Sequence, residues 1–366
     1  MNNSKDVENL DLNYIIEKLK IEFDIISNKN ILITGGAGFL GFYFVKSIVH
    51  WNNKNLKNKI NLTVSDSFIR GTPGWLKKLS DKNEITLFEH DVTKPIPKNI
   101  DNIDYIIHAA SIASPIYYRK YPIQTMDANV VGLRNLLDYS LKQENDNKKI
   151  SGFLFFSSSE VYGDPTSDKI PTEETYWGNV SFTGPRACYD ESKRYGETLC
   201  INFAQQYQLP IKIARPFNNY GPGLKIDDKR VIPDIARNIF ENKNVILYSN
   251  GSPTRTFCYV ADAIVGYYKI LIKGNSGEAY NIGIEKPEVS IKELANKIVS
   301  ISNELFNYSG KLEFKNNEDI NYLKDNPNRR CPSITKAKNE IDFYPEIGLE
   351  EGLRRSLIWY KDNNNL

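Results

Sequence analysis

The 366-residue sequence has few of the side chains that build metal sites and disulfide frameworks. It contains four cysteines, widely separated and without a Cys-x-x-Cys pair, and only three histidines. Structural zinc sites and disulfide scaffolds need such residues in clustered spacings, so we expect neither. The shortage of histidine also argues against a Ser-His-Asp hydrolase, because each of the three lies in a segment with another expected role.

The chain also lacks an excess of one charge and any long apolar run. Lys and Arg number 47 against 45 Asp and Glu, a net charge of +2 that is too small to hold a nucleic acid or an acidic membrane. No stretch approaches the roughly 20 apolar residues that cross a bilayer, and the first residues lack the apolar core of a secretion signal. We therefore expect a folded, cytoplasmic protein with neither nucleic acid nor membrane as partner.

What the sequence does contain is an alternation of short apolar runs and longer helical patterns. The expected strands are residues 31–34, 60–64, 85–89, 105–109, 153–157 and 211–214. The expected helices include residues 39–49, 129–139 and 189–206. Strand and helix in turn predict an α/β fold built on a doubly wound parallel sheet.

A glycine-rich turn joins the first expected strand to the first expected helix. Residues 31–41 read Ile-Leu-Ile-Thr-Gly-Gly-Ala-Gly-Phe-Leu-Gly. Such a turn brings backbone N–H groups at a helix N-terminus to a pyrophosphate, as in a Rossmann dinucleotide site. An ordinary strand-to-helix turn is the alternative, and the flanking elements argue against it. The residues expected at the cofactor here are Gly35, Gly38, Phe39, Leu40 and Gly41.

A carboxylate stands at the end of the second expected strand. Asp66 lies 25 residues past Gly41, where it can bind a ribose 2′-hydroxyl, which favours NAD over NADP. Arg70 keeps NADP open, because a guanidinium can accept a 2′-phosphate. Asp91 is expected at the adenine, with capping of the next turn as the alternative role. The other expected cofactor contacts are Val92 and Ala109.

Three parts of the chain are expected. Residues 1–28 form an N-terminal helical extension, since residues 10–28 carry apolar side chains at helical spacing. We favour packing of this extension on the domain behind it over a dimer contact. Residues 29–217 form the dinucleotide-binding domain. After Pro216 the sequence becomes rich in loop-forming residues, so residues 218–366 are expected as a smaller substrate-binding lobe with some segments returning to the first domain.

Tyr189 and Lys193 lie four residues apart, on one face of an expected helix. A tyrosine loses its proton near pH ~10, so a phenol that acts as a base at neutral pH needs a cation beside it. Lys193 supplies that cation. Tyr-x-x-x-Lys alone is often a surface pair, whereas beside a dinucleotide site it indicates a catalytic base.

These motifs resemble the extended short-chain dehydrogenase/reductase family, whose members bind NAD and modify nucleotide-activated sugars. Residues 108–110, 215–218 and 255–262 fall in the family's order as well. Residues 113–115, 159–165, 176–180 and above all 184–194 are most similar to its UDP-glucuronate decarboxylases, or UDP-xylose synthases. The resemblance implies an NAD-dependent enzyme with a nucleotide-sugar substrate. It also implies a homodimer built on the helices 129–139 and 189–206.

The triplet Ser158-Ser159-Glu160 helps to choose among the reactions of this family. The resemblance implies that Tyr189 takes the proton of the sugar C4 hydroxyl and that Ser158 hydrogen-bonds that oxygen. The family's 4,6-dehydratases carry an aspartic acid where Ser159 stands, and its 4-epimerases lack the carboxylate of Glu160. Decarboxylation remains: a 4-keto glucuronic acid is a β-keto acid, and Ser159 and Glu160 can orient its carboxylate and manage protons at C5.

Three other interpretations stay open. A 4-epimerase or a 4,6-dehydratase is the alternative reaction. A non-catalytic NAD-binding scaffold is the alternative class, although it would not need Ser158, Tyr189 and Lys193. At the level of the segment itself, the strand-end residues 157–160, Ser-Ser-Ser-Glu, could simply cap the following loop.

Seven further residues are expected at the substrate. Guanidinium groups can bind a diphosphate or a carboxylate at two points, and the remaining residues can contact the sugar. The set is Pro115, Tyr118, Arg186, Asn218, Arg230, Arg255 and Arg330. Asn326 and Ser333 replace aspartates of the resembling decarboxylases, so the sequence leaves the nucleobase open.

Overall fold

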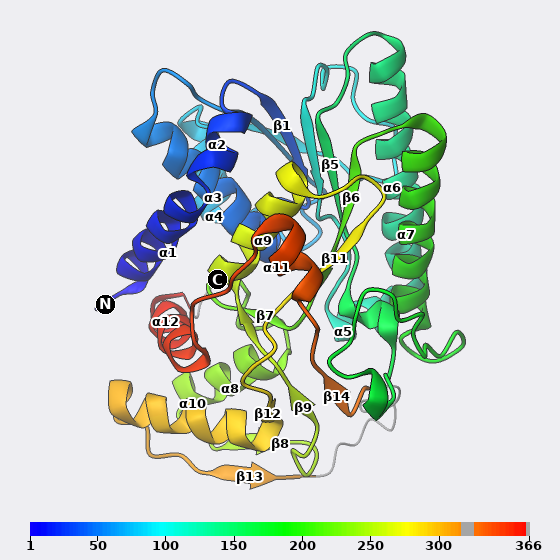
Figure 1. Ribbon diagram of the computed structural model, residues 1–366. Helices are drawn as coiled ribbons and strands as arrows, with labels where there is room; N and C mark the ends of the chain where they lie inside the picture. The colour runs from blue at the N-terminus through cyan, green and yellow to red at the C-terminus, as the bar shows by residue number, and fades with distance from the viewer. Residues whose placement is uncertain (316–325, 364–366) are drawn as a thin grey trace.

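The computed structural model describes residues 1–315 and 326–363, which form a seven-stranded parallel sheet, helices on both of its faces and a smaller lobe (Figure 1). The strand order is β11-β6-β5-β4-β1-β2-β3. The strands are β1 (Asn30–Thr34), β2 (Asn61–Asp66), β3 (Thr86–Glu89), β4 (Tyr105–His108), β5 (Gly152–Phe156), β6 (Ile211–Pro216) and β11 (Ala279–Ile282). The order runs outward from β1 in both directions, which confirms the doubly wound fold and puts the switch point between β1 and β4.

Alternation of side chains along β1 shows how the sheet is buried on both faces. Ile31 and Ile33 pack into the cluster of α3 (Phe39–Lys54) and α9 (Val260–Lys273), together with Leu76 of α4 (Gly74–Asp81). Leu32, between them, packs on the opposite face with α6 (Pro122–Asn145) and α7 (Ala187–Tyr207). Successive strand residues point to opposite faces, so a continuous apolar run is what a doubly covered parallel strand requires.

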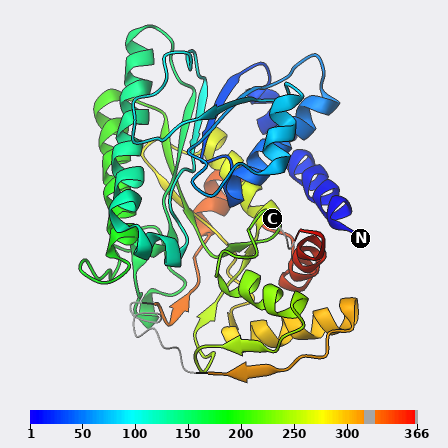
Figure 2. The ribbon, with the colours of Figure 1, turned by 180° about the vertical axis from the view of Figure 1, so that it is seen from behind.

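The N-terminal residues form two helices that pack on the chain's own core. Helices α1 (Ser4–Lys18) and α2 (Lys20–Ile26) lie against α9, and α1 runs beside α12 (Leu349–Asp362), as both views show (Figures 1 and 2). Asp11 is buried there, accepts hydrogen bonds from the hydroxyls of Tyr43 and Tyr259, and pairs with Arg355 at 2.7 Å. The buried apolar residues of these two helices and of the residue between them are Val7, Leu12, Ile15, Leu19, Phe23 and Ile26.

After β6 the chain alternates between the lobe and the main sheet. The lobe contains α8 (Val231–Phe240), α10 (Ile291–Phe306), the paired strands β8 (Val245–Leu247) and β13 (Leu312–Phe314), and a three-stranded sheet of β12 (Val289–Ser290), β9 (Thr254–Arg255) and β14 (Arg329–Arg330). Strands β7 (Asn219–Tyr220) and β10 (Cys258–Tyr259) pair nearby, whereas α9 and β11 return to the main sheet and α11 (Thr335–Ile341) packs on them. Residues 316–325 and 364–366 of the expected lobe lie outside the described residues.

Short elements at the carboxyl ends of the central strands complete the framework of the site. Helix α5 (Pro115–Lys120) follows β4, and the 3-10 helices η1 (Ser159–Tyr162) and η2 (Ser167–Lys169) follow β5. Among the described residues we find no helix with both the length and the apolar character needed to span a membrane.

Candidate active site

The glycine turn after β1 fits a dinucleotide. Gly35 has a φ of +76°, and a Cβ atom there would lie 2.5 Å from the backbone nitrogen of Ala110. A Cβ at Gly41 would lie 2.5 Å from the carbonyl oxygen of Gly36. No described side chain caps α3 at Gly38, so the N–H groups of its first turn, including Phe39 and Leu40, remain for a phosphate.

The acidic residue that ends β2 holds this turn in place. The Asp66 carboxylate accepts hydrogen bonds from the backbone nitrogens of Ala37, at 3.0 Å, and Phe68, at 2.9 Å. Burial raises the pKa of Asp66 despite these bonds. Arg70 pairs with Asp227 at 2.7 Å and Asp228 at 3.3 Å, so its guanidinium is already engaged by two carboxylates. This arrangement favours a free ribose hydroxyl over a 2′-phosphate at the edge of β2.

The other predicted cofactor residues line the same edge of the sheet. Asp91 accepts a hydrogen bond from the nitrogen of Thr93 at 2.9 Å, which is the capping role weighed as its alternative. Val92 is buried, and its side chain faces Gly132 of α6. Ala109 directly follows β4, and its backbone lies against Gly35.

Ser158, Tyr189 and Lys193 come together where β5 ends and α7 begins. All three are buried, and the Lys193 ammonium lies 5.7 Å from the centre of the Tyr189 ring. It donates a hydrogen bond of 2.7 Å to the carbonyl of Phe156, the last residue of β5. Burial lowers the pKa of Lys193 to about 7. Burial also raises the pKa of Tyr189 to about 12, an effect that its hydrogen bond with Ser158 opposes.

Glu160 lies between two arginines that come from distant parts of the chain. Arg330 of β14 donates to both of its carboxylate oxygens, at 2.5 and 2.6 Å, and Arg186, which precedes α7, forms a further ion pair with it. Burial alone would raise the pKa of Glu160, but Arg186 and Arg330 outweigh burial and lower it. Glu160 is therefore ionised, and two guanidinium groups share this one carboxylate.

Part of this segment does cap the following loop, but the capping residue is Ser158 and not Glu160. The side chain that accepts from the first turn of η1 is Ser158, whose hydroxyl lies 3.2 Å from the backbone nitrogen of Glu160. Ser159 is buried at the start of η1. The strand-end triplet thus provides one cap, one buried hydroxyl and one ion-paired carboxylate.

The remaining predicted arginines engage other partners. Arg255 of β9 lies beside Arg330 in the strand register and donates to the carbonyls of Thr254, at 2.7 Å, and Asn328, at 3.1 Å. Burial and the neighbouring Arg330 lower the pKa of Arg255 to about 9. Arg230 pairs with Asp228 at 3.0 Å. Of the four predicted arginines, Arg186 and Arg330 converge on Glu160.

Of the predicted sugar-contact residues, some lie beside Tyr189 and others engage different partners. Pro115 begins α5, and Tyr118 of this helix stacks on Tyr189 with ring centres 5.1 Å apart. Asn218 instead donates to the carbonyl of Thr256 at 2.9 Å. Sequence reasoning missed Asp190, which is buried beside Tyr189 and lies 3.6 Å from Arg186. Its only signal was its place inside the Tyr189–Lys193 motif.

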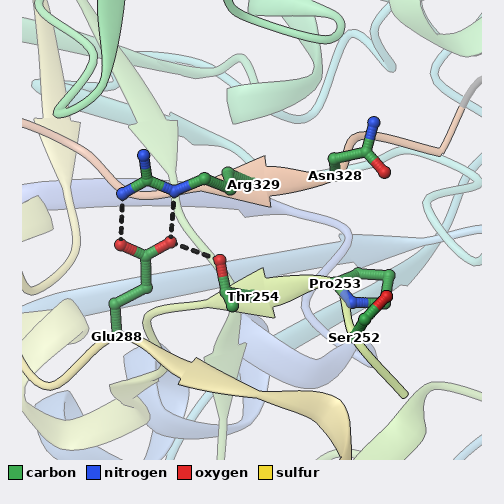
Figure 3. Close-up of a pocket in the computed structure, with 6 residues that line it drawn as sticks. All are labelled: Ser252, Pro253, Thr254, Glu288, Asn328 and Arg329. Carbon is green, nitrogen blue, oxygen red and sulfur yellow. Dashed lines mark hydrogen bonds and ion pairs between the residues drawn. The ribbon is translucent and has the colours of Figure 1, made fainter. Parts of the chain in front are cut away.

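A pocket of about 420 Å³ lies in the lobe, beside Arg255 and Arg330 in sequence (Figure 3). Arg329 donates to Glu288 at 2.9 and 2.7 Å, and Thr254 also donates to Glu288. Neighbouring residues of a strand face opposite sides, so Arg329 and Thr254 point away from the face that carries Arg330 and Arg255. The pocket is lined by Ser252, Pro253, Thr254, Glu288, Asn328 and Arg329. Its charged groups already pair with one another.

Comparison with known proteins agrees with this geometry. The sequence profile described as the NAD dependent epimerase/dehydratase family matches residues 31–283. UDP-glucuronic acid decarboxylase 5 of Arabidopsis thaliana is 38% identical over 328 residues, covering 89% of this chain and 88% of its own. UDP-glucuronic acid decarboxylase 1 of Xenopus tropicalis is 34% identical, covering 91% of this chain and 72% of its own.

Solved structures show the same fold. An epimerase of Methanothermobacter thermautotrophicus matches with a TM-score of 0.77 and 25% identity, covering 95% of this chain and 96% of its own. A UDP-glucose 4-epimerase of Thermotoga maritima matches with a TM-score of 0.74 and 23% identity, covering 91% of this chain and 99% of its own. On the glycine turn, the Tyr189–Lys193 pair and the extent of these matches, the chain belongs to the NAD-dependent epimerase/dehydratase family, with NAD as its cofactor.

Proposed function

We propose that the protein decarboxylates UDP-glucuronate to UDP-xylose. The observation that carries the proposal is the ionised Glu160 beside the Ser158–Tyr189 pair, held by two arginines. Two guanidinium groups and one carboxylate leave one positive charge, which matches an anionic group of the substrate. The similarity to UDP-glucuronic acid decarboxylases over about nine tenths of the chain supports the same reaction.

The buried residues act on the sugar C4 hydroxyl. Tyr189 takes its proton, Ser158 hydrogen-bonds its oxygen, and the ammonium of Lys193 favours the phenolate form of Tyr189. NAD, held by the glycine turn after β1, would supply the acceptor for the C4 hydride and afterwards its donor. The resulting C4 ketone lies β to the carboxylate, so breaking the bond from C5 to the carboxyl carbon leaves its electron pair delocalised onto the C4 oxygen. Arg186, Arg330 and Glu160 orient the departing carboxylate.

A product assay tests this function directly. Purified protein with UDP-glucuronate is expected to release one carbon dioxide per sugar and to give a pentose product by mass spectrometry. A product of unchanged mass with inverted C4 would instead identify a 4-epimerase, and loss of water from another nucleotide sugar would identify a dehydratase. Unchanged substrates with NAD still bound would identify a scaffold. Parallel assays with UDP-, dTDP-, CDP- and GDP-sugars show which nucleobase the enzyme accepts.

The proposal also covers assembly and location. The enzyme is proposed to act as a homodimer through α6 and α7 and to work in the cytoplasm on a soluble nucleotide sugar. The support is the balanced charge and the exposed apolar side chains on these two helices, among them Ile123, Met126 and Val131 of α6 and Tyr195 of α7.

A further inference from the structure

A second carboxylate shares the arginine that holds Glu160. Asp190 is only 5% exposed and follows Tyr189 in the first turn of α7. One of its oxygens lies 3.6 Å from Nε of Arg186, whose Nη2 pairs with Glu160. A single guanidinium therefore joins the two carboxyl groups, one on each side.

The surroundings of Asp190 suit a carboxylic acid better than a carboxylate ion. Among the described residues, its Oδ1 has no hydrogen-bond partner, and neither do Nε of Arg186 and the hydroxyl of Tyr118. An ionised carboxylate with an unpaired buried oxygen is costly, whereas a neutral acid is much less so. Three buried polar atoms thus lie unpaired in one cluster next to Glu160.

The charged and titratable groups around Asp190 come from four elements. They are Arg186, Cys188 and Tyr189 at the start of α7, Glu160 of η1, Tyr118 of α5 and Arg330 of β14. Burial and the negative charge of Glu160 raise the pKa of Asp190, against the opposing effect of Arg186 and Arg330. The pKa of Glu160 shifts in the opposite direction, because both arginines lie closer to Glu160 than to Asp190. Two neighbouring carboxyl groups with pKa values pushed apart are the usual arrangement of an acid and a base.

The proposed reaction needs an acid that the residues assigned so far do not provide. When carbon dioxide leaves, C5 must gain one proton before C4 is again a ketone that can accept the hydride. The proton on Tyr189 came from the C4 hydroxyl and returns to the C4 oxygen. Glu160 is ionised. One further proton is therefore consumed in each turnover.

We propose that Asp190 supplies the proton that replaces the carboxylate at C5. This inference rests on the proposed decarboxylase function. Giving up the proton turns Asp190 into a carboxylate ion, and Arg186 is placed to pair with that charge. Solvent then reprotonates Asp190 before the next turnover, so protons and charge balance.

Single-turnover kinetics of Asp190→Asn test the proposal, with Glu191→Gln as the matched control. Glu191 is the next carboxylate on the same helix, is partly exposed and pairs with Arg194. With NAD-loaded enzyme and UDP-glucuronate, Asp190→Asn is expected to form NADH and release carbon dioxide. Reoxidation of that NADH is expected to slow on the order of 10²-fold, because C5 stays unprotonated. Glu191→Gln is expected to match the wild type, and Asp190→Glu to restore part of the rate.

The pH dependence gives a second readout that a structural role would not change. The acid form of Asp190 is required, and it is lost as pH rises through a pKa of about 7. Wild-type NADH reoxidation should therefore slow about tenfold per pH unit above that value, whereas Asp190→Asn should be slow and should keep only the pH dependence that Lys193, with its own pKa of about 7, causes.

The outcomes separate the two proposals. Wild-type protein that releases no carbon dioxide from UDP-glucuronate overturns the function and the role of Asp190 together. Wild-type release with unchanged NADH reoxidation in Asp190→Asn overturns the role of Asp190 alone. If the asparagine variant does not fold or loses NAD, the wild-type profile decides, and reoxidation that stays constant up to about pH 9 overturns the role.

Discussion

Burial sets the chemistry of individual side chains at the site. A free tyrosine and a free lysine have pKa values near ~10 and ~10.4, so neither is active as a base at neutral pH. Inside the protein, burial raises the pKa of Tyr189 to about 12 and lowers that of Lys193 to about 7. The phenol thus keeps its proton in the resting site and must release it to solvent before it can accept the proton of the C4 hydroxyl, and the positive charge of Lys193 favours that release.

Replacement of the phenol tests the first step. Tyr189→Phe is expected to keep NAD and substrate bound but to slow NADH formation by on the order of 10²-fold or more, because the C4 hydroxyl has no base. Stopped-flow absorbance measures the step, and the NAD content is measured separately. Tyr195→Phe is the control, since Tyr195 is an exposed tyrosine of the same helix. NADH formation at the wild-type rate in Tyr189→Phe would reject the role.

Glu160→Gln separates the oxidation step from the decarboxylation step. The amide keeps the size and loses the charge, so NADH should still form while carbon dioxide release falls sharply. Stability should also fall by about 3–5 kcal/mol, because Arg186 and Arg330 lose their buried partner.

Glu288→Gln is the matched control for Glu160→Gln. It breaks a similar two-point pair with Arg329 on the other face of β14, where both side chains are partly exposed. We expect a cost of about 0–1 kcal/mol and unchanged carbon dioxide release. Undiminished release in Glu160→Gln would remove Glu160 from the mechanism.

Sequence spacing predicted only the local part of this site. Tyr189 and Lys193 meet because residues four apart share a helix face, and Ser158 joins them because parallel strands end at one edge. Glu160, Arg186 and Arg330 lie far apart in the sequence, and their contact depends on β14 pairing with β9. No local pattern encodes such a pairing, so the sequence named these residues through resemblance and could not give their partners.

At the scale of elements, periodic patterns predicted the long helices and central strands, with bounds that differ by a few residues. Helix α6 begins at Pro122 rather than at the expected residue 129, and proline suits the first turn of a helix. Strand β11 was not expected, because it returns to the sheet from a distant part of the chain to pair with β6. The strands β9, β12 and β14 are two residues long, too short for any period to show.

The N-terminal helices contribute to the hydrophobic core, and one pair of variants measures how much stability they add. Phe23 is fully buried, stacks on Trp51 and packs tilted against Tyr268, with ring centres 5.2 and 5.1 Å away. Phe23→Ala is expected to cost about 3–5 kcal/mol in chemical denaturation, because it leaves a cavity among these rings. Ile21, two residues earlier, is 65% exposed, so Ile21→Ala should change stability by about 0.5 kcal/mol at most. Equal effects of the two substitutions would contradict the packing of α2.

At the scale of the whole molecule, we propose that the apolar side chains left exposed on α6 and α7 face a second subunit. A stable dimer buries roughly 1,200–2,000 Å² in total, and two adjoining long helices can supply such a face. Ile123, Met126 and Val131 of α6 and Tyr195 of α7 are exposed, although their helices are otherwise well packed against each other. We expect light scattering to show a particle of twice the 41.9 kDa subunit mass.

Charged residues placed on this face should separate the subunits without unfolding them. The double variant Met126→Glu with Val131→Glu puts carboxylates where an apolar interface would exclude water, and burying an unpaired charge costs several kcal/mol. In the monomer both positions face solvent, so the two substitutions should not damage the core. Any fall in the melting temperature of the separated subunit should come from the loss of the interface. Leu56→Glu changes a more exposed apolar residue away from these helices and should leave the dimer intact. Wild-type protein that scatters as a monomer at tens of micromolar, or a double variant that remains dimeric, would show that α6 and α7 do not form the interface.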